Sequence, residues 1–419
     1  MFTIEGFELK EKLHESSRTT VYRAYDQKEE RLSVLKILNQ EYPTKRSLLR
    51  FRHEYQLLRE LELEGVIKVH ELLTQKHRPI LVLEDFGGYS LRTLLEKGLP
   101  KIEEMLEYAI QIAQALGELH QHHIIHKDLN PSNIALNPET KQLKLLDLGI
   151  ATRFSQQQRA LKSANVLEGT LAYISPEQTG RMNRPVDART DFYSLGITLY
   201  RCFTGHLPFR AEDPLSWLHH HIASEPAPPH HLRPNIPESL SQVLLKLMAK
   251  SPDDRYQSAN GLLHDLKACL VHHKTGSGGS SFAPGQHDFS ETLRISQKLY
   301  GRKQELDLLL KLYQQTSEGG CELVLLSGYA GIGKSRLVKE LYQPLTQNRG
   351  FFLSGKFEQY QRDIPYLAFV QAFSSLFRQL LSESDEELKR WKARIIKALG
   401  SNTSLFVQFI PELEWLLGP

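Results

Sequence analysis

The stretch 123–149 carries a pattern of acidic, amide and imidazole side chains that few folds can use. His126, Asp128 and Asn133 follow the pattern H-x-D-x-x-x-x-N, and Asp147 begins an Asp-Leu-Gly turn fourteen residues after Asn133. A short apolar run, typical of a strand, leads into that turn. Two acidic groups and an amide on adjacent loops could hold Mg²⁺ against a triphosphate while a third group orients a hydroxyl nucleophile. The pattern therefore indicates phosphoryl transfer.

This spacing resembles the catalytic and metal-binding loops of the eukaryotic-like (Hanks-type) serine/threonine protein kinases. The resemblance implies that Asp128 is the catalytic base, that Asn133 and Asp147 hold the metal, and that His126 supports the loop. It also implies ATP as the phosphoryl donor and Mg²⁺ or Mn²⁺ as the metal. The opposing interpretation, that these residues lie in unrelated turns, is disfavoured because other elements of the family occur in order on both sides.

Composition limits the classes of protein that the chain can belong to. A length of 419 residues is too great for one hydrophobic core, so two or three domains are expected. A formal charge of +3 gives no case for nucleic acid or an anionic membrane surface as the main partner. The three cysteines are far apart and lack metal-ligand spacing, which favours a reducing cytoplasm. The N-terminus has no signal-peptide pattern, and no apolar run is long enough to predict a membrane segment.

The first strand-like segments, from residue 7 to residue 24, occupy the place of the family's glycine-rich phosphate loop. The three glycine positions of that loop hold His14, Ser16 and Thr19. Glycine matters there because a backbone without side chains can bring its N–H groups against the phosphates. A plain hairpin without a ligand is the alternative interpretation.

The next segments carry the residues that the resemblance assigns to ATP. Lys36, the single lysine of the apolar run SVLKIL, matches the family's strand lysine, and Glu54 on a predicted helix is its implied partner across the phosphates. Lysine and glutamate more often occupy exposed positions, which is the alternative interpretation for Lys36 and Glu54. The run ILVLEDFGG resembles the hinge between the kinase lobes. Leu83 would be the gatekeeper beside the adenine, and backbone groups of Glu84 and Phe86 would read its edge.

Apolar residues recur every three or four positions over 102–121, which predicts a helix beneath the catalytic loop. Lys127 and Asn130 stand where the family usually has arginine and lysine, so less positive charge is available to phosphate there. Thr170, in a segment resembling the substrate-docking turn, favours serine or threonine as the acceptor. The resemblance further implies Asp191 as a brace of the catalytic loop, Arg255 as the partner of Glu177, and Thr152, Ser155 and Ser163 as hydroxyls that could be phosphorylated.

A second nucleotide-binding pattern follows a Gly/Ser/Pro-rich segment at 273–290, which we interpret as a flexible linker. The pattern G-x-x-x-x-G-K-S starts at Gly328 and lies between a predicted buried strand and a predicted helix, which is the context of a P-loop. The amides of the loop, which includes Gly333, would cradle phosphates, Lys334 would reach the β and γ oxygens, and Ser335 would hold Mg²⁺.

The residues around this pattern resemble STAND/AAA-type signalling ATPases, although no later strand ends in an acidic pair. The order of parts resembles large bacterial signalling proteins, best known from cyanobacteria, that join a kinase, an ATPase, a GAF sensor and a histidine kinase. We therefore expect the chain to be the N-terminal part of a longer protein, with sensor and histidine-kinase domains as probable C-terminal partners. The substrate protein is unknown.

The sequence thus predicts an α+β bilobal kinase fold followed by a linker and an incomplete α/β P-loop NTPase domain. The expected divisions are 1–84 for the small lobe, 85–272 for the large lobe, 273–290 for the linker and 291–419 for the ATPase part. The expected function is that of an ATP-dependent serine/threonine kinase in bacterial signal transduction, with a tethered nucleotide-binding regulatory domain.

Two other functions stay open. A pseudokinase that binds ATP or a partner and only regulates the attached ATPase is favoured by the missing glycines and by Asn130. A scaffold in which ATP at Lys334 drives self-association is the second. The histidine clusters at 219–221 and 230–231 could bind metal, but solvated loops are the preferred interpretation.

Overall fold

The computed structural model describes most of the chain, and every structural statement here concerns the described residues. These are 4–16, 18–40, 42–75, 77–153, 169–180, 182, 184–275, 282–289, 301–317, 319–329, 331–341, 344–345, 350–357, 366–380 and 385–417.

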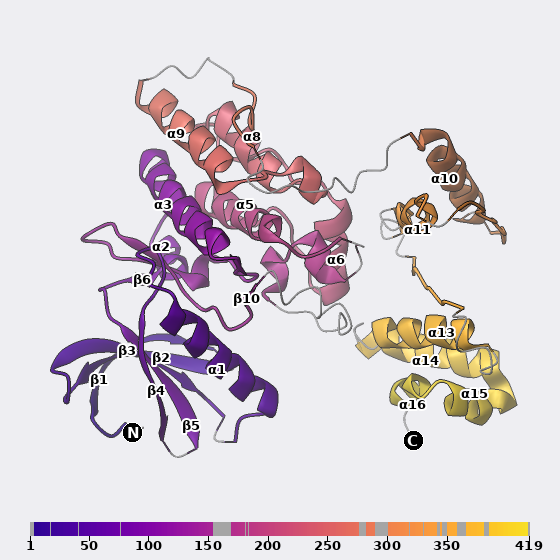
Figure 1. Cartoon of the computed structure of the whole chain (residues 1–419), viewed down its shortest axis with the longest axis horizontal. Helices are drawn as coiled ribbons and strands as arrows, with labels where there is room; N and C mark the ends of the chain where they lie inside the picture. Colours follow the sequence, from indigo (N-terminus) through magenta and orange to yellow (C-terminus); the bar gives the residue numbers. More distant parts are fainter. Residues whose placement is uncertain are drawn as a thin grey trace.

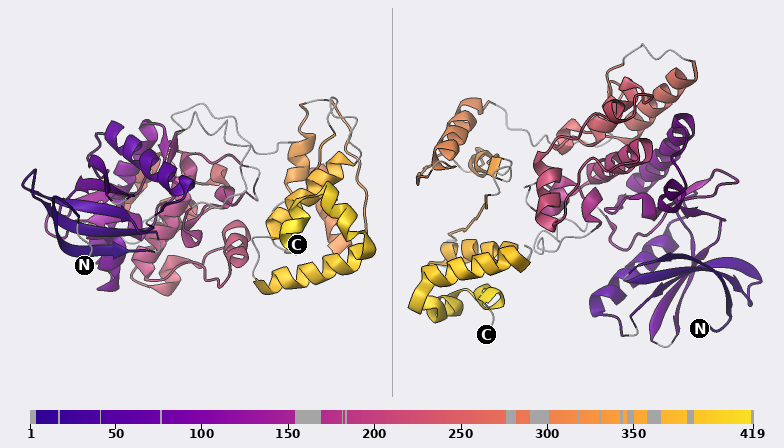
Figure 2. Two further views of the ribbon diagram at one scale, coloured as in Figure 1. Left: turned by 90° about the horizontal axis from the view of Figure 1, so that it is seen from below. Right: turned by 180° about the vertical axis from the view of Figure 1, so that it is seen from behind.

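An antiparallel sheet of five strands in the order β1-β2-β3-β5-β4 forms the small lobe, with one long helix against it (Figures 1 and 2). The predicted strands over 7–24, around Lys36 and at the hinge run are confirmed. Alternation along the central strand β3 sends Leu35 and Ile37 into one apolar cluster and turns Lys36 to the opposite face. The elements are β1 (Phe7–Glu15), β2 (Thr19–Asp26), β3 (Arg31–Leu38), α1 (Lys45–Glu60), β4 (Val69–Gln75) and β5 (Arg78–Glu84).

Helices dominate the large lobe, and α3 is confirmed where apolar periodicity predicts it, at 102–121. It packs along α9 and against α5, and one continuous apolar core runs from α1 to α9. The loops of the candidate site therefore rest on a rigid base. The elements are β6 (Tyr89–Ser90), α2 (Leu91–Glu96), α3 (Ile102–Gln121), β7 (Ile124–Ile125), η1 (Pro131–Asn133), β8 (Ile134–Leu136), β9 (Leu143–Leu145), β10 (Thr152–Arg153), η2 (Leu171–Tyr173), η3 (Pro176–Thr179), α5 (Ala188–Thr204), α6 (Pro214–Ala223), α7 (Pro229–Leu232), α8 (Glu238–Leu247), η4 (Pro252–Asp254) and α9 (Ala259–Thr275).

Residues 282–289, here called the strap, pack back onto the large lobe. The carboxylate of Asp288 accepts hydrogen bonds from the backbone N–H groups of Gln257 (2.6 Å) and Ser258 (3.0 Å), just before α9 begins. Gly261 makes room for this contact, because a Cβ there would lie 2.4 Å from Oδ1 of Asp288. One aspartate thus caps the start of a helix from a distant segment.

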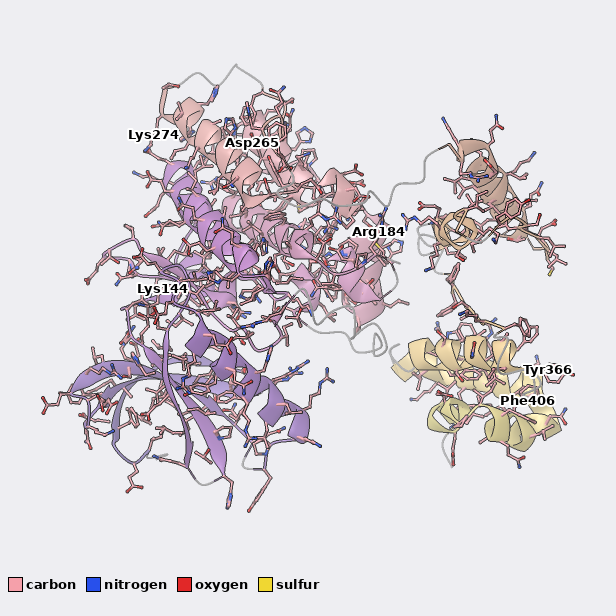
Figure 3. All side chains as sticks on the ribbon, viewed as in Figure 1. Lys144, Arg184, Asp265, Lys274, Tyr366 and Phe406 are labelled. Atoms are coloured by element: carbon pink, nitrogen blue, oxygen red, sulfur yellow. The ribbon has the colours of Figure 1, made fainter. Side chains whose placement is uncertain are left out.

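Two further contacts hold the strap. Phe282 packs against the main core, and the backbone N–H of Gly285 donates to Asp265 (2.7 Å), a buried residue of α9 that Figure 3 labels. Composition predicts a flexible linker over 273–290. The structure differs over 282–289, since these eight residues are bound to the large lobe through partly buried polar contacts.

The C-terminal part is mostly helical in the described residues. A small apolar cluster joins α13 to the helices that follow it, with Phe377, Leu380 and Leu413 at its centre. The elements are α10 (Lys303–Ser317), α11 (Lys334–Lys339), α13 (Leu367–Leu380), α14 (Asp385–Leu399), η5 (Gly400–Asn402), α15 (Thr403–Phe409) and α16 (Glu412–Leu417).

The prediction of a buried strand before the P-loop is wrong. Residues 321–329 join no β-ladder, and the side chains of Leu323 and Leu325 are 84% and 85% exposed. A strand of a parallel sheet needs hydrogen-bonding neighbours. No strand pairs with this segment in the part of the chain that the structure describes.

No helix among the described residues is long and apolar enough to cross a membrane.

The strap predicts a specific stability coupling. Asp288→Ala should lower the free energy of unfolding by about 1–2 kcal/mol, because two amides at the start of α9 lose their acceptor. Gly261→Ala should cost a similar amount by displacing Asp288. Hydrogen exchange at the amides of Gln257 and Ser258 and urea unfolding of the whole chain measure both effects. The double variant should lose less than the sum, and strictly additive losses would contradict a shared contact.

Candidate active site

A buried ion pair joins the central strand of the sheet to the long helix. Nζ of Lys36 lies 2.8 Å from both carboxylate oxygens of Glu54 and 3.1 Å from Oδ1 of Asp147. The side chains of Lys36 and Glu54 are 11% and 3% exposed, so neither takes the exposed position that is commoner for its type. Burial alone would lower the pKa of Lys36, but the carboxylates of Asp147 and Glu54 outweigh it and raise that pKa above its ordinary value.

Asp128 lies in the loop before η1, and its carboxylate is held by three donors. Oδ1 accepts the backbone N–H of Thr170 (2.8 Å) and Nδ2 of Asn130 (3.2 Å), while Oδ2 accepts Nδ2 of Asn133 (3.2 Å). Burial raises the pKa of Asp128, and the Thr170 hydrogen bonds only partly oppose that rise. The raised pKa makes this carboxylate a stronger base than a solvated aspartate.

The backbone of this loop is anchored from below by Asp191, a fully buried residue of α5. Its carboxylate accepts the N–H groups of His126 (2.9 Å) and Lys127 (2.8 Å). Nε2 of His126 donates to the carbonyl of Leu146 (2.9 Å), which leaves its Nδ1 to accept the N–H of Asp128 (3.3 Å). The imidazole thereby joins the loop of Asp128 to the turn that begins at Asp147.

Asn133 and Asp147 supply the oxygen atoms that a hard divalent cation prefers. Nδ2 of Asn133 donates to the carbonyl of Asp128 (2.8 Å). The side-chain oxygen of Asn133 is therefore the atom available to a cation. Asp147 has a left-handed backbone, with φ +60°, and its side chain is 42% exposed. Desolvation would raise its pKa, but the charge and hydrogen bond of Lys36 lower it, which keeps the carboxylate ionised. The pair therefore fits Mg²⁺ or Mn²⁺.

The residues predicted to form the hinge, Leu83, Glu84 and Phe86, lie at the end of β5 and just after it. Leu83, the next-to-last residue of β5, lies in the core, and the Glu84 carboxylate accepts a hydrogen bond from Nζ of Lys144 (2.6 Å), a buried lysine between the lobes (Figure 3). The carbonyl of Phe86 accepts Nδ2 of Asn137 (2.5 Å), so the N–H of Phe86 is the backbone group that this residue offers to an adenine. Sequence reasoning missed Lys144 and Asn137, although a lysine within an apolar strand is a usable signal.

The turn between β1 and β2 bonds to itself. Oγ of Ser16 accepts the backbone N–H groups of Arg18 (3.2 Å) and Thr19 (3.0 Å), two of the amides that a phosphate lid would offer. Nδ2 of Asn39, at the end of β3, donates to the carbonyl of Ser16 (2.7 Å). The lid is therefore closed on its own hydroxyl and tied to the sheet. His14 lies on β1, and burial lowers its pKa.

Arg23 fixes the same hairpin to the hinge. It donates to Asp85 (2.7 Å), to Glu11 (2.7 Å) and to the hydroxyl of Tyr89 (3.0 Å). No sequence motif marked this contact. Arg23 thus ties the β1–β2 hairpin to Asp85 and Tyr89, in the segment after β5.

The segment that follows Thr170 is locked to the large lobe by Glu177. Arg255 contacts both of its carboxylate oxygens (2.7 and 2.9 Å), as predicted, and Thr190 adds a third hydrogen bond (2.7 Å). Thr152 lies in β10. Ser155 and Ser163 lie outside the described residues.

The P-loop pattern forms a compact turn before α11. Gly331 and Gly333 have φ of +82° and +96°, a conformation that side chains disfavour. Nζ of Lys334 donates to the carbonyls of Gly328 (2.7 Å) and Tyr329 (2.9 Å). The lysine thus lies over the loop that would hold phosphate, and Ser335 follows it on the exposed side of the helix.

The histidine clusters are not solvated loops, because 219–221 belong to α6 and 230–231 to α7. His221 is buried, and its Nδ1 lies 3.0 Å from the hydroxyl of Tyr193 while Nε2 donates to the carbonyl of Leu171 (2.9 Å). Burial lowers the pKa of His221 to about 3, so it is a neutral structural residue. No group of three metal-binding side chains exists among the described residues.

Comparison with known proteins gives two family matches, the protein kinase domain over residues 7–266 and the AAA ATPase domain over residues 298–413. The chain is 32% identical over 268 residues to serine/threonine-protein kinase PknB of Mycolicibacterium smegmatis, covering 62% of this chain and 42% of that protein.

Two histidine kinases are also similar to the chain. Hybrid signal transduction histidine kinase G of Dictyostelium discoideum is 36% identical over 269 residues, which is 59% of this chain and 8% of that protein. Histidine protein kinase 1 of Candida albicans is 27% identical over 352 residues, which is 77% of this chain and 14% of that protein. The chain thus spans less than half the length of each of these relatives.

The kinase match covers most of the residues that form the two lobes and the site between them. The expected fold class is confirmed, a bilobal kinase fold followed by an AAA-type ATPase domain. This chain belongs to the protein kinase domain family.

Proposed function

We propose that the chain transfers the γ-phosphoryl group of ATP to serine or threonine hydroxyls of a protein. The observation that carries this is the contact of Lys36 with both Glu54 and Asp147, in a structure where Asp128 is already oriented by the amide of Thr170. In such a site catalysis is mostly positioning and electrostatic stabilisation.

Each predicted residue receives a role in this proposal. Lys36, held by Glu54, would contact phosphate oxygens, and Asp128 would accept the proton of the acceptor hydroxyl. Asn133 and Asp147 would hold Mg²⁺ or Mn²⁺, which would neutralise charge on the phosphates. The adenine would lie beside Leu83 and bond to the backbone of the hinge, including the N–H of Phe86.

The proposal extends to the protein's setting. The similarity to two histidine kinases much longer than this chain supports a signalling protein with further sensor and histidine-kinase domains. We keep the proposed division at 84/85 and place the strap, 282–289, with the kinase domain because of its contacts with α9. The three cysteines are free thiols, which agrees with the cytoplasm as the proposed compartment.

The kinase assignment makes different predictions for its two aspartates. Asp128→Asn should reduce phosphotransfer about 10²–10⁴-fold by removing the base, while ATP binding stays near that of the parent. Asp147→Asn should also weaken Mg²⁺-dependent ATP binding. Radiolabel transfer and ATP titration measure these effects, with Asp307→Asn, an exposed change on α10, as the control. Parent-rate transfer in both aspartate variants would sink the assignment.

A pseudokinase is the second candidate, and the closed lid is the observation that favours it. Ser16 occupies two amides that would otherwise donate to phosphate, so the lid adds little to ATP affinity.

The lid makes a testable prediction about nucleotide affinity. Ser16→Gly should tighten ATP about tenfold by freeing the amides of Arg18 and Thr19, and the triple change of His14, Ser16 and Thr19 to glycine should tighten it further. Ser16→Thr keeps the hydroxyl and should change little. Calorimetric titration of each variant decides, and an unchanged affinity in the glycine variants would mean that the lid reaches phosphate by another route.

The P-loop domain is proposed to bind nucleotide and to hydrolyse it very slowly. Its loop and Lys334 supply the phosphate contacts. Hydrolysis also needs an acidic residue at the metal and a group that positions water. No strand ending in a carboxylate follows α11 in the described residues, and the segment before the loop is exposed.

ATP turnover by Asp128→Asn protein, compared with the same protein carrying Lys334→Ala, tests this. We expect little turnover in either, with weaker nucleotide binding only in the second. Ordinary ATPase turnover that disappears with Lys334→Ala would be incompatible with the proposal. It would direct attention to Glu358 or Asp363, which lie outside the described residues.

A further inference from the structure

A short segment connects Asp128 to an arginine on the far side of the acceptor region. The amide of Thr170 donates to Asp128 (2.8 Å), the N–H of Tyr173 donates to the carbonyl of Thr170 (2.8 Å), and Nη1 of Arg201 donates to the Tyr173 hydroxyl (2.6 Å). One 3₁₀ turn and one tyrosine side chain thus separate Arg201 from Asp128. An extended peptide of a few residues, at about 3.3 Å per residue, covers a path of that kind.

Arg201 differs from the two arginines that form the buried ion pairs of this lobe, Arg255 and Arg189. Arg255 contacts the carboxylate of Glu177, and Arg189 contacts that of Asp187. In the described part of the chain no carboxylate lies within ion-pair distance of Arg201, which donates to the neutral hydroxyl of Tyr173. A partly buried cation that faces a neutral group gains much from an anion that arrives with a ligand.

The position of Arg201 is rigid. It lies in the last turn of α5, and Tyr173 is 5% exposed, with its carbonyl held by Oγ of Ser194 (2.8 Å). The guanidinium is therefore preorganised, so little conformational entropy is lost when it binds an anion.

A second arginine, Arg92 of α2, acts on the same region. Burial raises the pKa of Tyr173, and the charges of Arg201 and Arg92 both oppose that rise. Burial, and then the charge of Arg92, also lower the pKa of His14, at the lid. The helix that carries Arg92, α2, packs against η1, the 3₁₀ turn that follows Asp128. The ion pair of Arg92 with Glu96 (3.3 Å) has side chains 54% and 62% exposed, so an incoming anion can compete for it.

We propose, on the basis of the kinase function above, that the acceptor is an acidic segment. A carboxylate side chain two to four residues from the acceptor serine or threonine would bind Arg201, and a second would approach Arg92. The proposed phosphotransfer would thus act on a particular class of substrate, namely serine or threonine within an acidic segment. This preference acts on binding of the acceptor, because Arg201 lies away from the transferred phosphate.

The test uses the whole chain and synthetic peptides with one serine in an alanine background. Asp, Ala or Arg is placed in turn at each of four positions on either side. We expect Asp at one of these positions to raise kcat/KM about tenfold over Ala, mainly through KM, and Arg to lower it. Equal kcat/KM for Asp and Ala peptides at every position would overturn the acidic preference alone. No transfer to any peptide class would overturn the proposed function and the acidic acceptor together.

Variants identify the residue responsible. Arg201→Gln keeps a donor for Tyr173 and should abolish the preference for Asp, whereas Arg201→Glu should favour Arg peptides. Lys267→Glu, an exposed change on α9 with the same change in net charge, should leave the preference intact. Arg92→Gln, an exposed change, should weaken the preference about threefold even if the Arg201 variants fail to fold. An unaltered Asp preference in folded Arg201→Gln protein would remove Arg201 from the proposal.

Discussion

The buried ion pair between Lys36 and Glu54 is the interaction on which the geometry of the site depends. It fixes α1 against the central strand of the sheet, and the contact of Lys36 with Asp147 adds the turn from the large lobe. Removing one partner would leave an uncompensated charge in the interior, at a cost of about 3–5 kcal/mol. Three segments far apart in the sequence therefore keep their relative positions through one ammonium group.

A series of buried hydrogen bonds connects this ion pair to the helices of the large lobe. His126 connects the turn of Asp147 to the loop of Asp128, and Asp191 anchors that loop to α5. Each of these groups has satisfied hydrogen bonds, which is why a polar chain can cross the interior without destabilising it. The residues proposed to act on ATP are thus built on rigid elements, whereas the tip of the lid is closed by a single serine hydroxyl.

The sequence predicts those site residues that belong to recognisable motifs with set spacing. Lys36 contacts both Glu54 and Asp147, and His126 joins the turn of Asp147 to the loop of Asp128. The alternation of β3 turns Lys36 away from its apolar neighbours. Sequence could not show that Ser16 turns back on its own amides, since a serine in a hairpin looks the same whether its hydroxyl faces water or backbone.

Other failures have the same origin in distant contacts. The apolar run before the P-loop predicts a strand from local propensity, but a strand exists only where neighbours complete its hydrogen bonds. His221 was grouped with its neighbours in sequence, although its environment is set by Tyr193 and Leu171. The Gly/Ser/Pro composition around the strap suggested an unbound segment because the acceptors and the space that hold Asp288 lie near residue 260.

The strap shortens the free connection between the two domains and so raises the effective concentration of each domain near the other. With the chain bound as far as Phe289, residues 290–302 are all that separate it from the start of α10. Thirteen residues span at most about 45 Å when fully extended. The ATPase domain is thereby confined near one end of α9, at an effective concentration on the order of millimolar. Weak contacts between the domains, too weak to be detected between separate molecules, would be substantially occupied at that concentration.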